Sequence, residues 1–186
     1  MGWSRTPVDA TARRSQARGS KEPAVKTASA PRATQPPDLE AAIRSRRYRR
    51  VPRASVAARV SAIRSGLSAT ILRDMADHMA IRQEQLYSTL GLARATMVRK
   101  LRNRERMKPD ESERVLGLAA IIGQVEDMVA RSGDPKGFDA ARWVAQWLRQ
   151  LLPALGGKAP AEWMDTSEGQ RLVADTLARM ESGAYA

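Results

Sequence analysis

The chain has 186 residues and a formal net charge of +12, from 32 basic and 20 acidic side chains. This length allows one domain or two small ones. The absence of cysteine excludes disulfide bonds and thiolate zinc sites, and it permits a reducing compartment. The longest central apolar run falls far short of the roughly 20 residues that span a bilayer. We therefore expect no membrane partner, and the N-terminus lacks the apolar stretch of a signal peptide.

The charge is unevenly distributed along the chain. Residues 1–60 carry a net charge of +10, residues 61–112 carry +4 and residues 113–186 carry −2. The front of the chain therefore suits a polyanion, whereas the back does not. Because aromatic side chains dominate core and interface energetics, the last third has a surface to bury against itself or a partner. It holds five of the eight aromatic residues, namely Phe138, Trp143, Trp147, Trp163 and Tyr185.

Residues 1–60 are predicted to form a basic, largely disordered N-terminal extension. Residues 1–40 are rich in Arg, Ala, Ser, Thr and Pro and offer almost nothing for a core. A transit peptide has a similar bias, but the prolines and acidic residues disfavour that alternative. A helix is possible from Asp38 to about Arg64. The run RSRRYRRVPR within it is either a solvated segment or a nucleic-acid arm that makes sequence-independent phosphate contacts.

Residues 61–131 are predicted to be helical throughout. Ile71, Leu72, Met75 and Met79 recur at helical intervals in one helix. A second helix, with Leu86 and Leu90, ends at Gly91, where a left-handed turn is expected.

A third short helix carries Met97 and Leu101 on its apolar stripe, and a longer helix runs from Pro109 to Ser132-Gly133. Helix, tight glycine turn and helix in about twenty residues form the helix-turn-helix pattern. Spacing alone fits an ordinary helical hairpin equally well.

The charge on the helix after Gly91 favours DNA binding. In a helix-turn-helix protein the second helix of the motif lies in the major groove. With Met97 and Leu101 facing inward, Val98 and four polar or small neighbours face outward. Tyr87 departs from the usual pattern, because a small residue normally packs at about that place; either the helices cross more loosely or the register shifts by one. The predicted DNA-binding residues are Arg94 as a base reader, Ala95, Arg99, and Arg102 and Arg104 as phosphate contacts.

No catalytic or metal-binding constellation is predicted. His78 is the only histidine, and no third ligand joins it beside Asp74 and Asp77, so a structural role is expected. The run Asp165-Thr166-Ser167-Glu168 fits a helix cap better than an acid/base cluster. Gly156-Gly157 lacks the phosphate-cradling glycine pattern and fits a plain turn. We therefore predict no enzyme activity, no cofactor and no metal.

Residues 132–186 are predicted to form a small helical C-terminal domain. Its first helix is expected to end before Pro153 and to bury Phe138, Ala141, Val144, Ala145, Leu148 and Leu151. Its last helix is expected to start at a cap on Asp165, to bury Leu172, Val173, Leu177 and Met180, and to end at Gly183. Trp143 and Trp147 lie one helical turn apart. The core accounts for one of them, and the second suggests an interface.

The segment ARWVAQWLRQLLPALGGKAPAEWMDTSEGQRLVADTLARMESGAYA resembles the toxin-binding domain of the Xre/MbcA/ParS antitoxins. The residues that match the family pattern in order are Trp147-Leu148, Pro153, Leu155-Gly156-Gly157, Pro160, Asp165-Thr166, Gly169, Val173, Leu177, Arg179, Glu181 and Gly183. Two departures are Trp163-Met164, where the family has aliphatic residues, and an insertion-like RQL before Pro153. The resemblance spans about residues 67–186.

The resemblance implies an antitoxin of a bacterial type II toxin–antitoxin pair. The family fold is all-α, with a helix-turn-helix DNA-binding and dimerisation domain, here 61–131, before a small toxin-binding domain, here 132–186. Such proteins block a toxin that is commonly a RES-domain protein consuming NAD, or a related ADP-ribosyltransferase-like fold. They also bind operator DNA, commonly as homodimers, and repress their operon. A cytoplasmic location, at the nucleoid when operator-bound, would follow.

The resemblance also directs attention to the C-terminal end as the part that blocks the toxin. Arg179 and Glu181 lie near the end of the last helix, where a guanidinium can meet a substrate-like anion site. Tyr185 offers a rigid ring with a hydrogen-bonding tip. The predicted toxin-binding residues are Trp163, Arg179, Glu181, Gly183 and Tyr185. The alternative is a plain helix-turn-helix regulator or nucleoid-type protein whose C-terminal domain only oligomerises.

Overall fold

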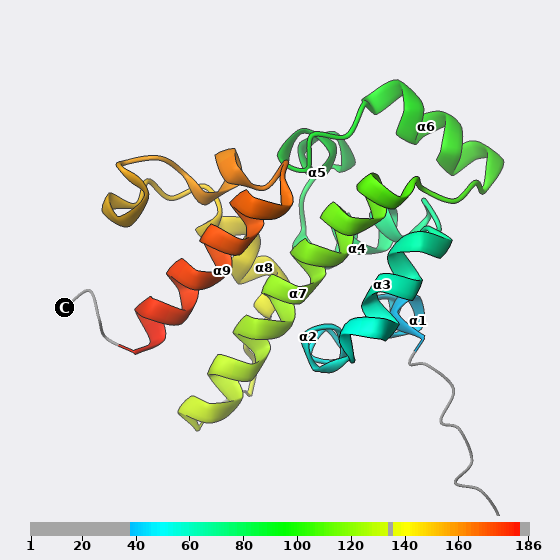
Figure 1. The fold of residues 1–186 in the computed structure, drawn as a ribbon. Helices are drawn as coiled ribbons and strands as arrows, with labels where there is room; N and C mark the ends of the chain where they lie inside the picture. The colour runs from blue at the N-terminus through cyan, green and yellow to red at the C-terminus, as the bar shows by residue number, and fades with distance from the viewer. Residues whose placement is uncertain (1–37, 134–135, 183–186) are drawn as a thin grey trace, which may run out of the picture. The chain divides into compact units, whose positions relative to one another are not determined.

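A computed structural model describes residues 38–133 and 136–182 (Figure 1). Secondary structure in these residues consists of helices and two isolated β-bridges, without a strand. The predicted all-α class is therefore confirmed. The α-helices are α1 (Leu39–Arg44), α2 (Arg50–Arg53), α3 (Val56–Ser65), α4 (Ile71–Met79), α5 (Gln83–Thr89), α6 (Arg94–Asn103), α7 (Pro109–Ser132), α8 (Ala140–Trp147) and α9 (Ser167–Glu181). Two 3-10 helices, η1 (Pro153–Leu155) and η2 (Pro160–Trp163), lie between α8 and α9.

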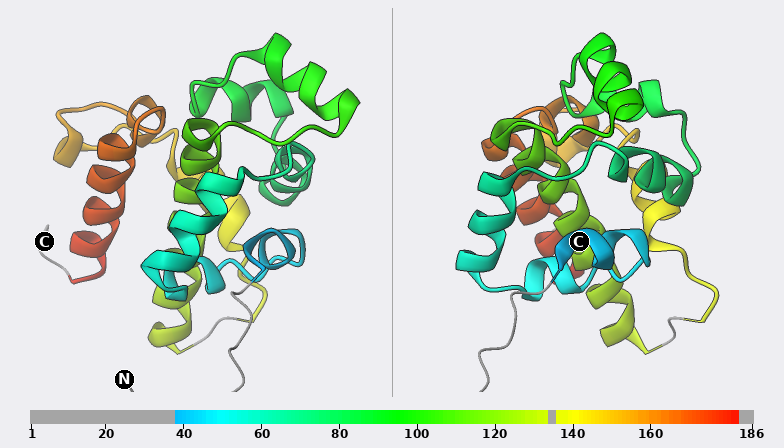
Figure 2. Two further views of the ribbon diagram at one scale, coloured as in Figure 1. Left: turned by 45° about the vertical axis from the view of Figure 1, so that its right-hand side comes forward. Right: turned by 90° about the vertical axis from the view of Figure 1, so that its right-hand side faces the viewer.

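Helix α7 is the central element of the described fold. Its 24 residues make it about 36 Å long. Pro109 occupies its first turn, and Gly133 closes it with a φ of 107°, as the sequence predicts. It contacts α2, α3, α8 and α9, and Figure 2 shows it between α3 and α9. Helices of both predicted domains therefore pack against α7.

The N-terminal boundary predicted at residue 60 needs correction, because residues 39–60 join the core. The possible helix from Asp38 to about Arg64 is present as three separate helices, α1 to α3. Ile43, Tyr48 and Val51 are almost completely buried. These apolar side chains alternate with arginines in the sequence, so the high charge of this stretch conceals them. The rest of the predicted extension, residues 1–37, lies outside the described residues.

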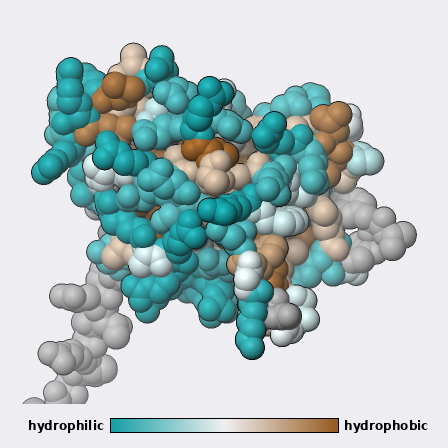
Figure 3. Space-filling model, turned by 180° about the vertical axis from the view of Figure 1, so that it is seen from behind, coloured by the Kyte–Doolittle hydropathy of each residue, from teal (hydrophilic) through white to brown (hydrophobic). Residues whose placement is uncertain are grey.

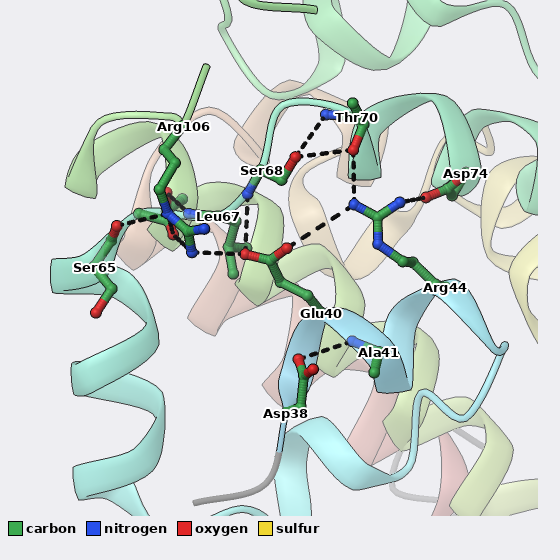
Figure 4. A network of polar contacts seen from close by, with 12 residues as sticks. Asp38, Glu40, Ala41, Arg44, Ser65, Leu67, Ser68, Thr70, Asp74 and Arg106 are labelled. Atoms are coloured by element: carbon green, nitrogen blue, oxygen red, sulfur yellow. Dashed lines mark hydrogen bonds and ion pairs between the residues drawn. The ribbon is translucent and has the colours of Figure 1, made fainter. Parts of the chain in front are cut away.

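Polar contacts join helix α1 to the start of α4 and to the loop after α6 (Figure 4). Glu40 Oε1 accepts from the Ser68 backbone N–H at 3.1 Å and from Arg106 Nη2 at 2.8 Å. Arg44 donates to Asp74 Oδ2 at 2.6 Å and to the Thr70 hydroxyl at 2.7 Å. The segment before α3 therefore supports α4 and the loop after α6.

Helices α5 and α6 form the predicted helix-turn-helix. Gly91, in the turn between them, has a φ of 58°, which a glycine adopts without steric cost. Leu92 is buried just before α6 begins, and Met97 is fully buried on the inner face of α6. Tyr87 is accommodated at the crossing, because its ring is buried and its hydroxyl donates to Gln83 Oε1 at 2.9 Å.

The first C-terminal helix is shorter than predicted. Phe138 and Leu151 lie outside α8, with 39% and 71% of their surface exposed, so the predicted apolar stripe is wrong at both ends. Asp139 begins α8 by accepting from the Arg142 backbone N–H. Trp147 is buried, whereas Trp143 is half-buried and stacks on it with ring centroids 5.8 Å apart.

The cap of α9 also differs from the prediction. Thr166, rather than Asp165, precedes the helix, and its hydroxyl accepts from the Gly169 N–H at 3.1 Å. A Cβ at Gly169 would lie 1.9 Å from the carbonyl oxygen of Trp163, so glycine permits η2 to approach α9 closely. Val173 and Leu177 are buried as predicted, but Met180 is 42% exposed, so the predicted apolar stripe of α9 is wrong at its last residue.

Candidate functional site

The outward face of α6 carries four of the five predicted DNA-binding residues. They surround a shallow concavity of about 600 Å³ whose lining residues are Arg94, Ala95, Val98, Arg99 and Arg102. All five side chains are exposed, as the position of Met97 on the opposite face requires. Arg104 is the fifth predicted residue; it ends α6 in a left-handed conformation with a φ of 54° and is also exposed.

Acidic side chains engage two of these arginines. Arg94 Nη2 lies 3.4 Å from Glu84 Oε1 on α5, and both side chains are largely exposed. Arg99 Nη1 donates to both oxygens of Glu105, at 2.7 and 2.9 Å. A hydrogen bond from Asn103, followed by the charge of Arg99, lowers the pKa of Glu105. Exposed pairs of this kind contribute little stability, so both guanidinium groups can exchange their carboxylate for a phosphate or a base.

The inner face of α6 has a polar contact that the sequence reasoning missed. Lys100 Nζ donates to Glu111 Oε2, and both residues are buried. Glu111 Oε2 also accepts from the Lys108 N–H at 2.6 Å, so one carboxylate joins the end of α6 to the start of α7. The sequence feature that could have predicted this pair is the position of Lys100, three residues after Met97 and therefore on the apolar face of the helix. This pair fixes how α6 projects from the molecule.

The basic run RSRRYRRVPR lies away from α6. Arg53 Nη2 pairs with Asp127 Oδ1 at 2.6 Å, and the Arg49 N–H donates to Glu126 Oε2 at 2.8 Å. These acidic residues are 17 residues into α7, roughly 25 Å from its start next to α6. Figure 1 shows α2 beside the lower half of α7 and α6 beyond its upper end. The run therefore does not extend the face of α6.

The predicted toxin-binding residues do not gather at one point. Trp163 is half-buried in η2, with Lys158 Nζ 5.3 Å from its ring centroid. Arg179 and Glu181 are exposed in the last turn of α9, and Arg179 lies roughly 18 Å from the start of that helix. Glu181 accepts two hydrogen bonds from Arg131 Nη2 of α7, at 2.8 and 3.0 Å. The other two predicted residues, Gly183 and Tyr185, lie outside the described residues.

The C-terminal domain is held against α7 by a buried amide that the sequence reasoning also missed. Gln170 Nε2 donates to the Arg114 carbonyl at 2.9 Å and to the Met164 carbonyl at 2.8 Å. Gly117 leaves space for this side chain, since a Cβ there would lie 1.7 Å from Gln170 Oε1. A glutamine beside the apolar stripe of α9 was the only signal in the sequence.

Exposed apolar side chains interrupt an otherwise hydrophilic surface (Figure 3). Val98 on α6 is 50% exposed and Leu151, in the RQL segment before η1, is 71% exposed. Val98 faces outward as predicted, whereas Leu151 was expected to be buried and is exposed because α8 ends at Trp147, four residues before it.

His78 has the structural environment that the sequence predicts. Its Nδ1 lies 2.8 Å from the Tyr48 hydroxyl, and the two rings meet edge to face. Burial, followed by the charge of Arg46, lowers the pKa of His78. Among residues 38–133 and 136–182, no three His, Cys, Asp or Glu side chains are grouped to hold a metal ion. None of the helices in these ranges is both long and apolar enough to cross a membrane.

These features define a helix-turn-helix protein whose central helix also supports a second, C-terminal helical domain. The antitoxin Xre-like helix-turn-helix domain family matches residues 58–120, and the antitoxin Xre/MbcA/ParS C-terminal toxin-binding domain family matches residues 137–183. Both matches agree with the prediction from the sequence, and neither family is one of enzymes.

Two similar proteins are also named as antitoxins. The chain is 43% identical over 139 residues to the Prs ADP-ribosylating antitoxin of Sphingobium sp. (strain YBL2), an alignment that covers 75% of this chain and 87% of that protein. It is 21% identical over 126 residues to antitoxin Xre of Yersinia enterocolitica, covering 68% and 80%. The chain belongs to the Xre/MbcA/ParS family of antitoxins. It combines a helix-turn-helix domain with a toxin-binding domain, so a cognate toxin is its partner.

Proposed function

We propose that this antitoxin neutralises a RES-domain toxin that consumes NAD, and that it represses its own operon as a homodimer. The toxin-binding family match over residues 137–183 carries the first half of this proposal. The name of the Sphingobium relative supports the chemistry, because it associates an antitoxin with ADP-ribosylation, a transfer that takes its ADP-ribose from NAD. The C-terminal domain then acts as a docking face that needs shape and hydrogen bonds rather than catalytic groups.

The proposed toxin contacts extend along α9. Trp163 in η2, before α9, and Arg179 at the end of α9 are exposed enough to meet a partner, and the residues after Ser182 would enter the substrate pocket of the toxin. Glu181 would either keep its pair with Arg131 or exchange it for a toxin cation. The separation of these residues, from η2 to the last turn of α9, favours an extended interface with a terminal plug.

The DNA-binding half of the proposal rests on α6. Its outward face presents three arginines on one side of a helix that follows a tight turn, the arrangement that enters a major groove. Arg94, in the first turn, is the proposed base reader, while Arg102 and Arg104 are the proposed phosphate contacts. A homodimer would place two such helices on neighbouring half-sites.

Co-expression with the product of the adjacent gene tests the toxin half. We expect the two proteins to co-purify, cell growth to recover, and NAD consumption by the partner to stop. A partner that binds but never consumes NAD would contradict the RES assignment alone. A reporter fused to the upstream DNA tests repression, and repression without any toxin binding would favour a plain regulator whose C-terminal domain only oligomerises.

A further inference from the structure

Val98 is an apolar residue in the middle of the outward face of α6, where it does not pack into the core. Half of its surface is exposed, whereas Met97 beside it is fully buried. A β-branched valine is a weaker helix former than Met97 and Arg99, the residues on either side of it. It therefore adds neither core packing nor helix propensity at this position, and its side chain is accessible to a molecule that approaches the helix.

The neighbours of Val98 indicate what that partner is. Arg94 and Arg102 lie four residues before and after it, on the same helical face, and all three line one shallow concavity. An apolar side chain between two guanidinium groups suits a surface that is anionic at its edges and carries an apolar group at its centre. The major groove of DNA has this combination, because thymine presents a C5-methyl group between the phosphate-bearing strands.

We propose that Val98 reads a thymine methyl group in the operator, so that it determines specificity at one base pair. This inference rests on the proposed DNA-binding function. Arg94 would bind an adjacent base and Arg102 a phosphate, while the two methyl groups of Val98 contact the thymine methyl. Guanine, adenine and cytosine offer no methyl group in that groove, so the contact discriminates thymine from all three.

The test uses the full chain and duplexes that it selects from a random-sequence pool. Each thymine of the selected duplex is replaced in turn by uracil, which pairs identically but lacks the methyl group. We expect one replacement to weaken binding about fourfold, which corresponds to about 0.8 kcal/mol for one methyl-sized apolar group. Val98→Ala should lose a similar factor on the thymine duplex and be insensitive to uracil at that position.

Val56→Ala is the matched control, because Val56 is 67% exposed on α3, which is not part of the face of α6. It should keep the preference of the wild type at every position, and the melting temperature should confirm that both variants are folded. Selection of a defined sequence by Val98→Ala with the same thymine preference would overturn the inference while leaving the proposed DNA binding intact. Failure of the wild-type chain to enrich any sequence would overturn both.

Discussion

Lys100 on α6 and Glu111 in the first turn of α7 form a buried ion pair that joins the second helix of the helix-turn-helix to the central helix. Removing one partner of a buried pair leaves an uncompensated charge and costs roughly 3–5 kcal/mol. We expect Lys100→Met to lower the free energy of unfolding by that amount, measured by urea denaturation. The double variant Lys100→Met, Glu111→Gln should recover most of the loss, because a neutral amide can still accept from the Lys108 N–H. A cost below about 1 kcal/mol for the single variant would show that the pair is solvated.

Arg94→Ala should weaken operator binding selectively. The loss of a bidentate contact to a guanine should cost roughly 1–3 kcal/mol on the operator and little on random DNA. The pair with Glu84 is exposed, so folding should be unaffected. Arg102→Ala is the comparison, because a phosphate contact should weaken both DNAs alike. Titrations on the two DNAs measure the difference, and equal losses for Arg94→Ala would assign it to the phosphate class.

Deleting residues 1–34 should flatten the salt dependence of DNA binding. These residues carry seven basic and two acidic side chains, and each phosphate they neutralise contributes about −0.9 to the slope of log K against log salt. The ratio of operator to random affinity should stay almost unchanged. Deletion of residues 1–60 is not an equivalent test, because it also removes the buried side chains of Ile43, Tyr48 and Val51. An unchanged slope would mean that residues 1–34 do not contact DNA.

Deleting residues 182–186 should weaken toxin inhibition and leave the fold intact. Val173 and Leu177, which anchor α9 in the core, remain in place, and so does the Arg131–Glu181 pair. Helical content and operator binding should therefore match those of the full chain. NAD consumption by the cognate toxin, measured with each antitoxin form, gives the result. Equal inhibition by the two forms would assign neutralisation to the face of α9 or to an inactive assembly.

The partial burial of His78 should make stability fall on mild acidification. Burial lowers the pKa of His78 in the folded state, so the unfolded chain binds more protons below its ordinary pKa of about 6.5. The contribution of neutral His78 is complete above pH 6.5 or so and is lost as the pH falls from there towards the lowered pKa. His78→Gln should flatten this part of the stability curve in urea titrations. Identical pH profiles for the two proteins would place His78 in a solvated site.

Local sequence signals predicted the helix-turn-helix and the central helix well. The signals came from Gly91, Pro109 and Gly133. Each acts through the backbone conformation of a single turn, so its effect can be predicted without knowledge of the rest of the fold. The spacing of Met97 and Leu101 likewise determines which face of α6 is outward. The spaced motif that begins at Trp147 identified the family for the same reason, since Trp147, Val173 and Leu177 are buried and Thr166 caps α9 within its own turn.

Tertiary structure alone decided the features that depend on distant neighbours. The predicted boundary assigned residues 39–60 to a basic, largely disordered extension, yet Tyr48 is buried because α7 and His78 lie against it. Lys100 and Gln170 look like surface residues until Glu111 and the Arg114 carbonyl supply their partners. The burial of a side chain and its polar partners depend on elements that are far apart in the sequence, whereas helix propensity, capping and apolar periodicity depend on residues that are close together in the sequence.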